Sequence, residues 1–103
     1  MFEVSVIIPT FNESQNILRV INEIENALKN YDYEIIVVDD NSPDETAEIV
    51  KKYTKSNSRV SCIKRTWKKG LSSAVVEGYA LSTKKHICVI DGCLLYTSDA
   101  ADE

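Results

Sequence analysis

Four short apolar runs, separated by longer segments, constrain this chain more than any other feature of its sequence. They are rich in β-branched residues and cover Glu3–Pro9, Tyr33–Asp40, Arg59–Arg65 and His86–Asp91. A strand that is apolar along its whole length has both faces buried, and such strands are typical of parallel sheets covered by helices on each side. We therefore expect four strands in one layered sheet.

The segments between these runs have the periodicity of helices. The first places four apolar residues on one helix face, at Ile17, Ile21, Ile24 and Leu28. The other two have stripes formed by Ala47, Val50 and Tyr53 and by Leu71, Ala74, Val75 and Gly78. The small side chains of the last stripe favour close packing on a sheet. This alternation predicts an α/β, Rossmann-like domain with a mostly parallel sheet and β-α-β-α-β-α-β order.

Polar residues before the first two helices resemble helix-capping sequences. Asn12 and Gln15 resemble a capping box at the start of the first helix. Before the second helix, Ser42 is expected as the N-cap, Pro43 as the first helical residue and Glu45 as the residue that closes the box.

Composition excludes several classes of protein. With 44% hydrophobic and 27% charged residues, the chain of 103 residues is globular in composition and not disordered. The net charge of −4 owes three charges to Asp99, Asp102 and Glu103, so the remainder is nearly neutral and has no nucleic-acid footprint. No apolar run is long enough to cross a bilayer and no signal peptide precedes the first strand, so we expect a cytoplasmic location.

Polar and charged residues gather where the predicted strands end. They are Pro9, Thr10, Asn12 and Glu13 after the first strand, Asp39 and Asp40 after the second, and Asp91 after the fourth. In open parallel sheets, ligands bind beyond the carboxyl ends of the strands, where the strand order reverses. Because adjacent carboxylates repel one another, Asp39 and Asp40 need a partner, either a ligand donor group, a cation or a basic side chain. The alternative is a solvated turn, and the basic run 64–70 is either a solvated loop or faces a diphosphate.

Four stretches together resemble a known family. They read VSVIIPTFNESQNI, YEIIVVDDNSPDET, KKGLSSAVVEGYA and ICVIDG, in that order. This combination is similar to the family 2 inverting glycosyltransferases with the GT-A fold, and most similar to the dolichol-phosphate and polyprenyl-phosphate mannose synthases. The resemblance covers residues 3–92.

The resemblance implies a role for each matching position. Pro9, Thr10, Asn12 and Glu13 match the loop beside the nucleoside of the sugar donor. One of Asp39 and Asp40 is expected to bind the base or the ribose. Gly70 begins a small-residue helix near the donor. Asp91 matches the first aspartate of the D-x-D motif, the catalytic position that binds Mg²⁺ or Mn²⁺ and the diphosphate.

The reaction implied is transfer of a hexose, with inversion, from a nucleotide-sugar to a polyprenyl or dolichyl phosphate at a membrane surface. GDP-mannose is the first expectation for the donor and UDP-glucose the second. A divalent cation would neutralise the charge that develops on the leaving diphosphate. The acceptor phosphate is already an anion at neutral pH, so it needs little help from a general base. The longer parent protein could be located at the cytosolic face of a membrane.

The last eleven residues do not fit the family. It commonly continues with D-G-D-L-Q-H-P, whereas position 93 is Cys. The string CLLYTSDAADE matches a translated transposon-type sequencing adaptor. We therefore expect residues 1–92 to be the N-terminal, nucleotide-sugar-binding part of a truncated GT-A domain, with 93–103 a non-native tail and the fragment inactive. The alternative is a short apolar strand followed by an acidic tail.

Two other classes share parts of this pattern. A phosphorelay receiver domain would use Asp91 as its phosphoacceptor, but its acidic pair ends the first strand, whereas here a complete strand and helix precede Asp39 and Asp40. A nucleotidyltransferase would need a glycine-rich, basic first loop, and Pro9, Thr10 and Phe11 stand in that place.

Overall fold

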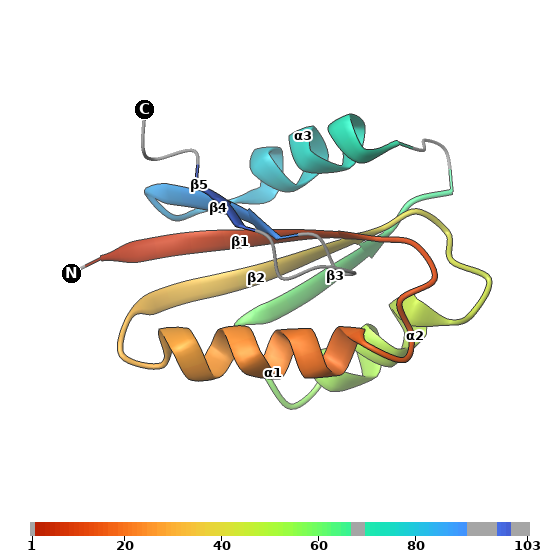
Figure 1. Cartoon of the computed structure of the whole chain (residues 1–103), viewed down its shortest axis with the longest axis horizontal. Coiled ribbons are helices and arrows are strands. Elements are labelled where there is room, and N and C mark those ends of the chain that lie inside the picture. Colours follow the sequence, from red (N-terminus) through yellow and green to blue (C-terminus); the bar gives the residue numbers. More distant parts are fainter. Residues whose placement is uncertain (1, 67–69, 91–96, 100–103) are drawn as a thin grey trace.

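The computed structural model describes residues 2–66, 70–90 and 97–99. They form one sheet flanked by helices (Figure 1), with the elements β1 Glu3–Thr10, α1 Ile17–Leu28, β2 Asp32–Asp39, α2 Thr46–Thr54, β3 Val60–Lys64, α3 Leu71–Leu81, β4 His86–Ile90 and β5 Thr97–Asp99. The predicted α/β class and the order of elements as far as β4 are confirmed.

The sheet has the strand order β3-β2-β1-β4-β5. β1 lies at the centre and pairs in parallel with both β2 and β4, and β2 pairs in parallel with β3. The order of the parallel strands therefore reverses between β1 and β4, which is where the carboxyl ends of strands leave room for a ligand.

The segment after position 92, set aside above as a tail, contributes β5. This strand pairs antiparallel with β4, with Ile90 opposite Thr97 and Cys88 opposite Asp99. The sheet is thus mostly parallel, as predicted, but it has one strand more than the expected four.

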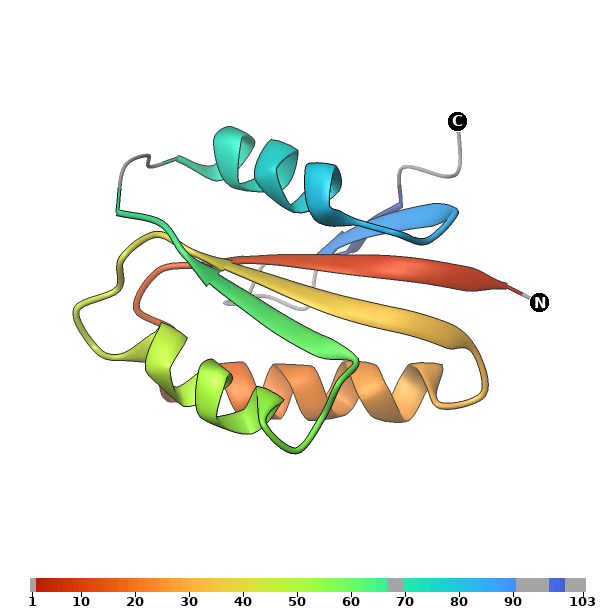
Figure 2. The ribbon, with the colours of Figure 1, turned by 180° about the vertical axis from the view of Figure 1, so that it is seen from behind.

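Helices cover both faces of the sheet. α1 and α2 lie on one face and α3 on the other, as Figures 1 and 2 show from opposite sides. Successive side chains of β1 point to opposite faces of the sheet. Val6 and Ile8 belong to the apolar cluster under α1 and α2, and Ile7 belongs to the cluster under α3. This double burial explains why the strand sequences are apolar without interruption.

α3 approaches the sheet closely because its inner face is small. Ala74 is fully buried, and a Cβ atom added at Gly78 would lie 2.6 Å from Cγ2 of Ile7. The predicted small-residue face is therefore confirmed at these two positions. Leu71 was wrongly included in it and is 63% exposed. It is the first residue of the helix, and because helical side chains tilt toward the N-terminus, that of Leu71 points beyond the helix end.

Both predicted helix caps were wrong. α1 begins after Asn16 and α2 after Glu45, and neither N-cap residue makes a side-chain capping hydrogen bond. α2 thus starts at Thr46, three residues later than Pro43. The physical reason is that the hydroxyl of Ser42 is engaged elsewhere, with groups from the ends of the first two strands.

Candidate functional site

The loops that follow β1 and β2 lie together at the carboxyl edge of the sheet, on the right-hand side of Figure 1. The strand register brings Thr10 beside Asp39, and Asp39 beside Lys64 of β3. The backbone N–H of Asp40 also donates to the carbonyl oxygen of Thr10 at 3.1 Å. The predicted gathering of strand ends at one edge is therefore present.

Asp39 is an internal carboxylate. Its side chain is completely buried, Oδ1 accepts the hydroxyls of Thr10 at 2.7 Å and of Ser42 at 2.6 Å, and Oδ2 accepts the backbone N–H of Ser42 at 2.9 Å. Three hydrogen bonds offset the cost of removing this carboxylate from water. Asp39 therefore closes the turn after β2, and of the two acidic residues only Asp40 is left as a candidate to bind the base or the ribose.

Asp40 is the member of the acidic pair that reaches the surface. Its side chain is 13% exposed, Oδ1 lies 2.7 Å from Nε and 2.5 Å from Nη2 of Arg65, and Oδ2 accepts the N–H of Gly70 at 3.1 Å. The partner that the adjacent carboxylates require is thus a basic side chain. It holds Asp40 at the junction of β2, β3 and α3.

The basic run was misinterpreted at its beginning. Arg65 is fully buried, and Lys64 pairs with Glu48 of α2 at 2.7 Å, so neither side chain faces a diphosphate. The sequence could not show this, because the burial of an arginine depends on a carboxylate supplied by another strand. Lys68 and Lys69 lie outside the described residues.

The first loop is fastened to the second by three successive backbone N–H groups. Those of Asn12, Glu13 and Ser14 donate at 2.9, 3.0 and 3.0 Å to side-chain oxygens of Ser42, Thr46 and Asp44, respectively. We call this set of contacts the loop brace. The roles of Asp44 and Thr46 were not predicted; the signal in the sequence was that both are hydrogen-bonding residues around the start of α2.

The brace also perturbs the acidity of Asp44. Partial desolvation raises its pKa, but hydrogen bonds from Thr46 and Ser14 outweigh that effect and lower the pKa from 3.8 to about 2. The ionised carboxylate is therefore the form that these donors stabilise. Asp44 therefore holds the two loops together in its ionised form.

Three residues of these loops have left-handed backbone conformations. They are Asn12 and Asn41, each with φ 58°, and Glu45 with φ 69°. Asn adopts the left-handed conformation more readily than most residues that have a Cβ atom, whereas this conformation is unfavourable for Glu. The side chains of Asn12 and Asn41 are exposed, so they present two amide groups at the edge of the sheet.

The described members of the predicted site are thus brought together, but not with one role. Of these, Asn12, Gly70 and part of Asp40 are accessible to a ligand, whereas Thr10, Glu13 and Asp39 are buried and Pro9 is half-buried. Asn41 is also exposed at this edge, although it was not among the predicted site residues. Asp91, the expected cation ligand, lies outside the described residues. Within the described ranges, no group of three or more His, Cys, Asp or Glu residues is arranged to hold a metal ion.

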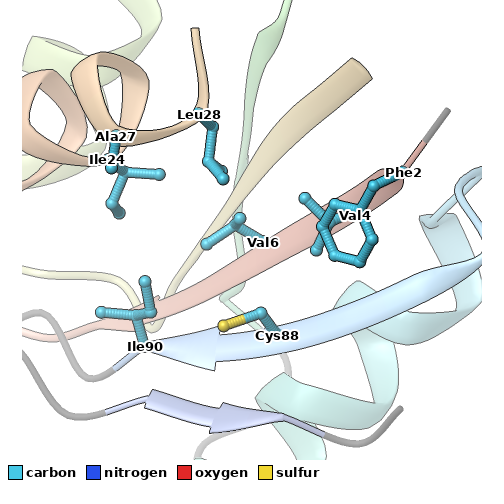
Figure 3. Close-up of a pocket in the computed structure, with 8 residues that line it drawn as sticks. All are labelled: Phe2, Val4, Val6, Ile24, Ala27, Leu28, Cys88 and Ile90. Carbon is cyan, nitrogen blue, oxygen red and sulfur yellow. The ribbon is translucent and has the colours of Figure 1, made fainter. Parts of the chain in front are cut away.

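An apolar pocket of about 240 Å³ lies between α1 and the strands β1 and β4. Figure 3 shows side chains of α1 and of the sheet pointing into it, including Ile24 and Leu28 from the helix and Val6 and Ile90 from the strands. None of the described residues that line it carries a charge that could bind a sugar nucleotide. Cys62 is partly buried against the core, and this burial raises the pKa of its thiol to about 12, which keeps it protonated.

A mostly parallel sheet with reversed strand order and polar loops at its carboxyl edge defines an open α/β domain of the class whose members bind ligands at that edge. The family described as "Glycosyl transferase family 2" matches residues 5–100, and the chain belongs to this family. The match confirms the predicted resemblance and decides against the receiver and nucleotidyltransferase alternatives.

Two relatives are dolichol-phosphate mannosyltransferases. The chain is 46% identical to that of Pyrococcus furiosus over 92 residues, which cover 89% of this chain and 26% of the relative. It is 33% identical to that of Mycosarcoma maydis over 102 residues, covering 93% of this chain and 35% of the relative. The chain thus spans about a quarter to a third of the length of these proteins.

Solved structures show the same fold. A mannosyltransferase from Pyrobaculum calidifontis, in complex with GDP-Man and Mn²⁺, matches with a TM-score of 0.77 and 24% identity, over 90% of this chain and 28% of that one. The strand order 3-2-1-4 is that of the N-terminal part of GT-A structures. No helix in the described part of this chain is long and apolar enough to cross a membrane.

Proposed function

We propose that the parent protein transfers a hexose, mannose in the first place, from a nucleoside-diphosphate sugar to a polyprenyl or dolichyl phosphate. Residues 1–92 would form its nucleotide-sugar-binding part. The observation that carries this proposal is the junction at Asp40, where a partly exposed carboxylate is held beside the exposed start of α3. The two relatives named dolichol-phosphate mannosyltransferases support the choice of substrate class.

The donor nucleoside would lie along the exposed part of the carboxyl edge. The N–H groups of a base and the hydroxyls of a ribose are donors, and the remaining lone pairs of Asp40 and the amide oxygens of Asn12 and Asn41 can accept them. Gly70, at φ 118°, adopts a backbone conformation that side chains disfavour. Because Pro9, Thr10 and Glu13 are half-buried or buried, their part would be to maintain the shape of the loop beside the nucleoside.

The bond changes of the proposed reaction are simple. A phosphate oxygen of the lipid attacks the anomeric carbon, the bond from that carbon to the diphosphate oxygen breaks, and the nucleoside diphosphate leaves with the electron pair. A single in-line displacement inverts the anomeric centre. Mg²⁺ or Mn²⁺ is proposed with Asp91 in the parent protein, but the described residues do not themselves fit a cation site, and their part is to hold the nucleoside.

We further propose that 93–103 is a non-native tail and that the fragment does not transfer sugar. The test is to sequence the gene at its source beyond the codon for Gly92. An aspartate in the second position of D-x-D is expected there. Codons for the present Cys-Leu-Leu-Tyr string in the genomic DNA would refute the proposal about the tail.

Donor binding is tested by titration calorimetry in buffer with MnCl₂. The full-length gene product should bind GDP-mannose more tightly than UDP-glucose, and Asp40→Asn should weaken binding of the nucleotide. Glu23→Gln, on the exposed face of α1, serves as a matched control that removes one charge far from the site. If the full-length protein gave no binding heat with any nucleoside-diphosphate sugar, the proposed function would be wrong.

A further inference from the structure

A fully buried arginine lies beneath the candidate site. Arg65 follows β3 directly, and none of its surface is exposed. Its backbone N–H donates to the carbonyl oxygen of Asp39 at 2.7 Å, which ties it to the end of β2. Burial of a charge without partners is strongly unfavourable, so the guanidinium must remain where its partners are.

The guanidinium connects Asp40 to the beginning of α3. Nε and Nη2 lie 2.7 and 2.5 Å from Oδ1 of Asp40, and Nη2 also donates to the carbonyl oxygen of Gly70 at 3.2 Å. The other carboxylate oxygen of Asp40 accepts the N–H of Gly70 at 3.1 Å. Asp40, Arg65 and Gly70 thus form a closed set of hydrogen bonds, which we call the Arg65 clamp.

The remaining guanidinium nitrogen, Nη1, differs from Nε and Nη2 in its contacts. Among the described residues, Nη1 has no hydrogen-bond partner, and it lies 3.9 Å from Oε1 of Glu77, a residue of α3 that is 31% exposed in its side chain. This contact is an ion pair without a hydrogen bond. Loss of the Glu77 charge should therefore leave the clamp intact, which makes Glu77 a matched control.

We propose that Arg65 is a positioning residue for donor binding, an inference that rests on the proposed function. Because it is fully buried, Arg65 does not touch the nucleotide. It acts by holding one oxygen of Asp40 while Gly70 holds the other, so that the carboxylate cannot rotate and its outward lone pairs keep one direction. The same contacts fix the place where the chain enters α3, and binding to a preorganised site avoids the cost of ordering these groups.

The first test compares Arg65→Lys and Arg65→Met with Glu77→Gln, all in the full-length gene product. Binding of GDP with MnCl₂ is measured by calorimetry at a temperature where circular dichroism shows each variant to be folded. Arg65→Met should weaken binding about tenfold, as expected for the loss of one charge-assisted hydrogen bond, Arg65→Lys should lie between it and wild type, and Glu77→Gln should bind like wild type.

The outcomes separate positioning from a merely structural role. If both Arg65 variants had lower melting temperatures but bound GDP as tightly as wild type, the positioning role would be overturned and the proposed function would stand. If the wild-type protein bound no nucleotide, the proposed function would fall, and the role of Arg65 with it.

A second test needs no variant and so does not depend on the folding of one. In nitrogen–proton NMR spectra of the wild-type protein, the Nε–H signal of Arg65 should exchange slowly with water, and it should shift and exchange still more slowly at saturating GDP. Arg19, whose side chain is 54% exposed, supplies a reference signal. An Arg65 signal unchanged in position and exchange rate on GDP binding would overturn the inference.

Discussion

Substitution of Gly78 by alanine tests how tightly α3 is seated on the sheet. The added Cβ would lie 2.6, 3.1 and 3.3 Å from Cγ2, Cγ1 and Cδ1 of Ile7. Ile7 is completely buried in the central strand, and its branched side chain has little rotamer freedom with which to withdraw. Two effects therefore oppose each other, since alanine also favours a helix over glycine by about 1 kcal/mol.

The steric effect is expected to win. Overpacking of a core costs about 1–3 kcal/mol. The upper part of that range applies here, because the nearest contact is with the Cγ2 methyl on the branched Cβ of a fully buried residue rather than with the end of a flexible chain. We expect Gly78→Ala to lower the free energy of unfolding by about 1–2 kcal/mol net, which corresponds to a fall in melting temperature of roughly 4–15 °C for a domain of this size.

The assay is urea unfolding followed by circular dichroism at 222 nm. Ser72→Ala, at an exposed position of the same helix, is the matched control and should be neutral or slightly stabilising. In an Ile7→Ala background, Gly78→Ala should lose its cost, because the clashing atoms are gone. A Gly78→Ala protein as stable as wild type would refute the account of how α3 packs.

Three further predictions concern the loops at the carboxyl edge. Ser42→Ala removes the hydroxyl that Asp39 and the N–H of Asn12 both use, so it should cost about 1–3 kcal/mol in urea unfolding; helical circular dichroism lost in the folded protein would instead point to a capping role. Glu45→Gly should raise the melting temperature, with a gain of about 0.5–1 kcal/mol from relief of a left-handed glutamate; a lower melting temperature would contradict this. The pKa of Asp44 is lowered from 3.8 to about 2 in the folded protein, so its contribution is complete above pH 3.8 and is lost as the pH falls through about 2. The difference in unfolding free energy between wild type and Asp44→Asn should shrink across that range, and a difference independent of pH would contradict the assigned cause.

The fold was predictable because its signals are local. The four parallel strands are rich in β-branched residues, and those of β1 and β2 are buried on both faces. The small residues Ala74 and Gly78 mark the side of α3 that meets Ile7. The gathering of Asp39 and Asp40 with the first loop followed from one general rule about parallel sheets.

The roles of individual site residues were not predictable, because they depend on partners far along the chain. Ser42 has the local sequence of a helix cap, yet its hydroxyl accepts a backbone N–H from a residue 30 positions earlier. Arg65 stands in a basic run that reads as a solvated loop, and only the carboxylate of Asp40, 25 positions earlier, explains its burial. A single sequence holds no record of such pairings.

The loop brace limits how the loop after β1 can be exchanged between members of this family. The backbone of residues 12–14 is held by side chains from the loop after β2 and from the first residue of α2. A transplanted first loop would therefore lack the acceptors that give it its shape. The two segments therefore depend on each other. A chimera that receives both from the same donor protein should keep the conformation of these loops, whereas a chimera that receives only one should not.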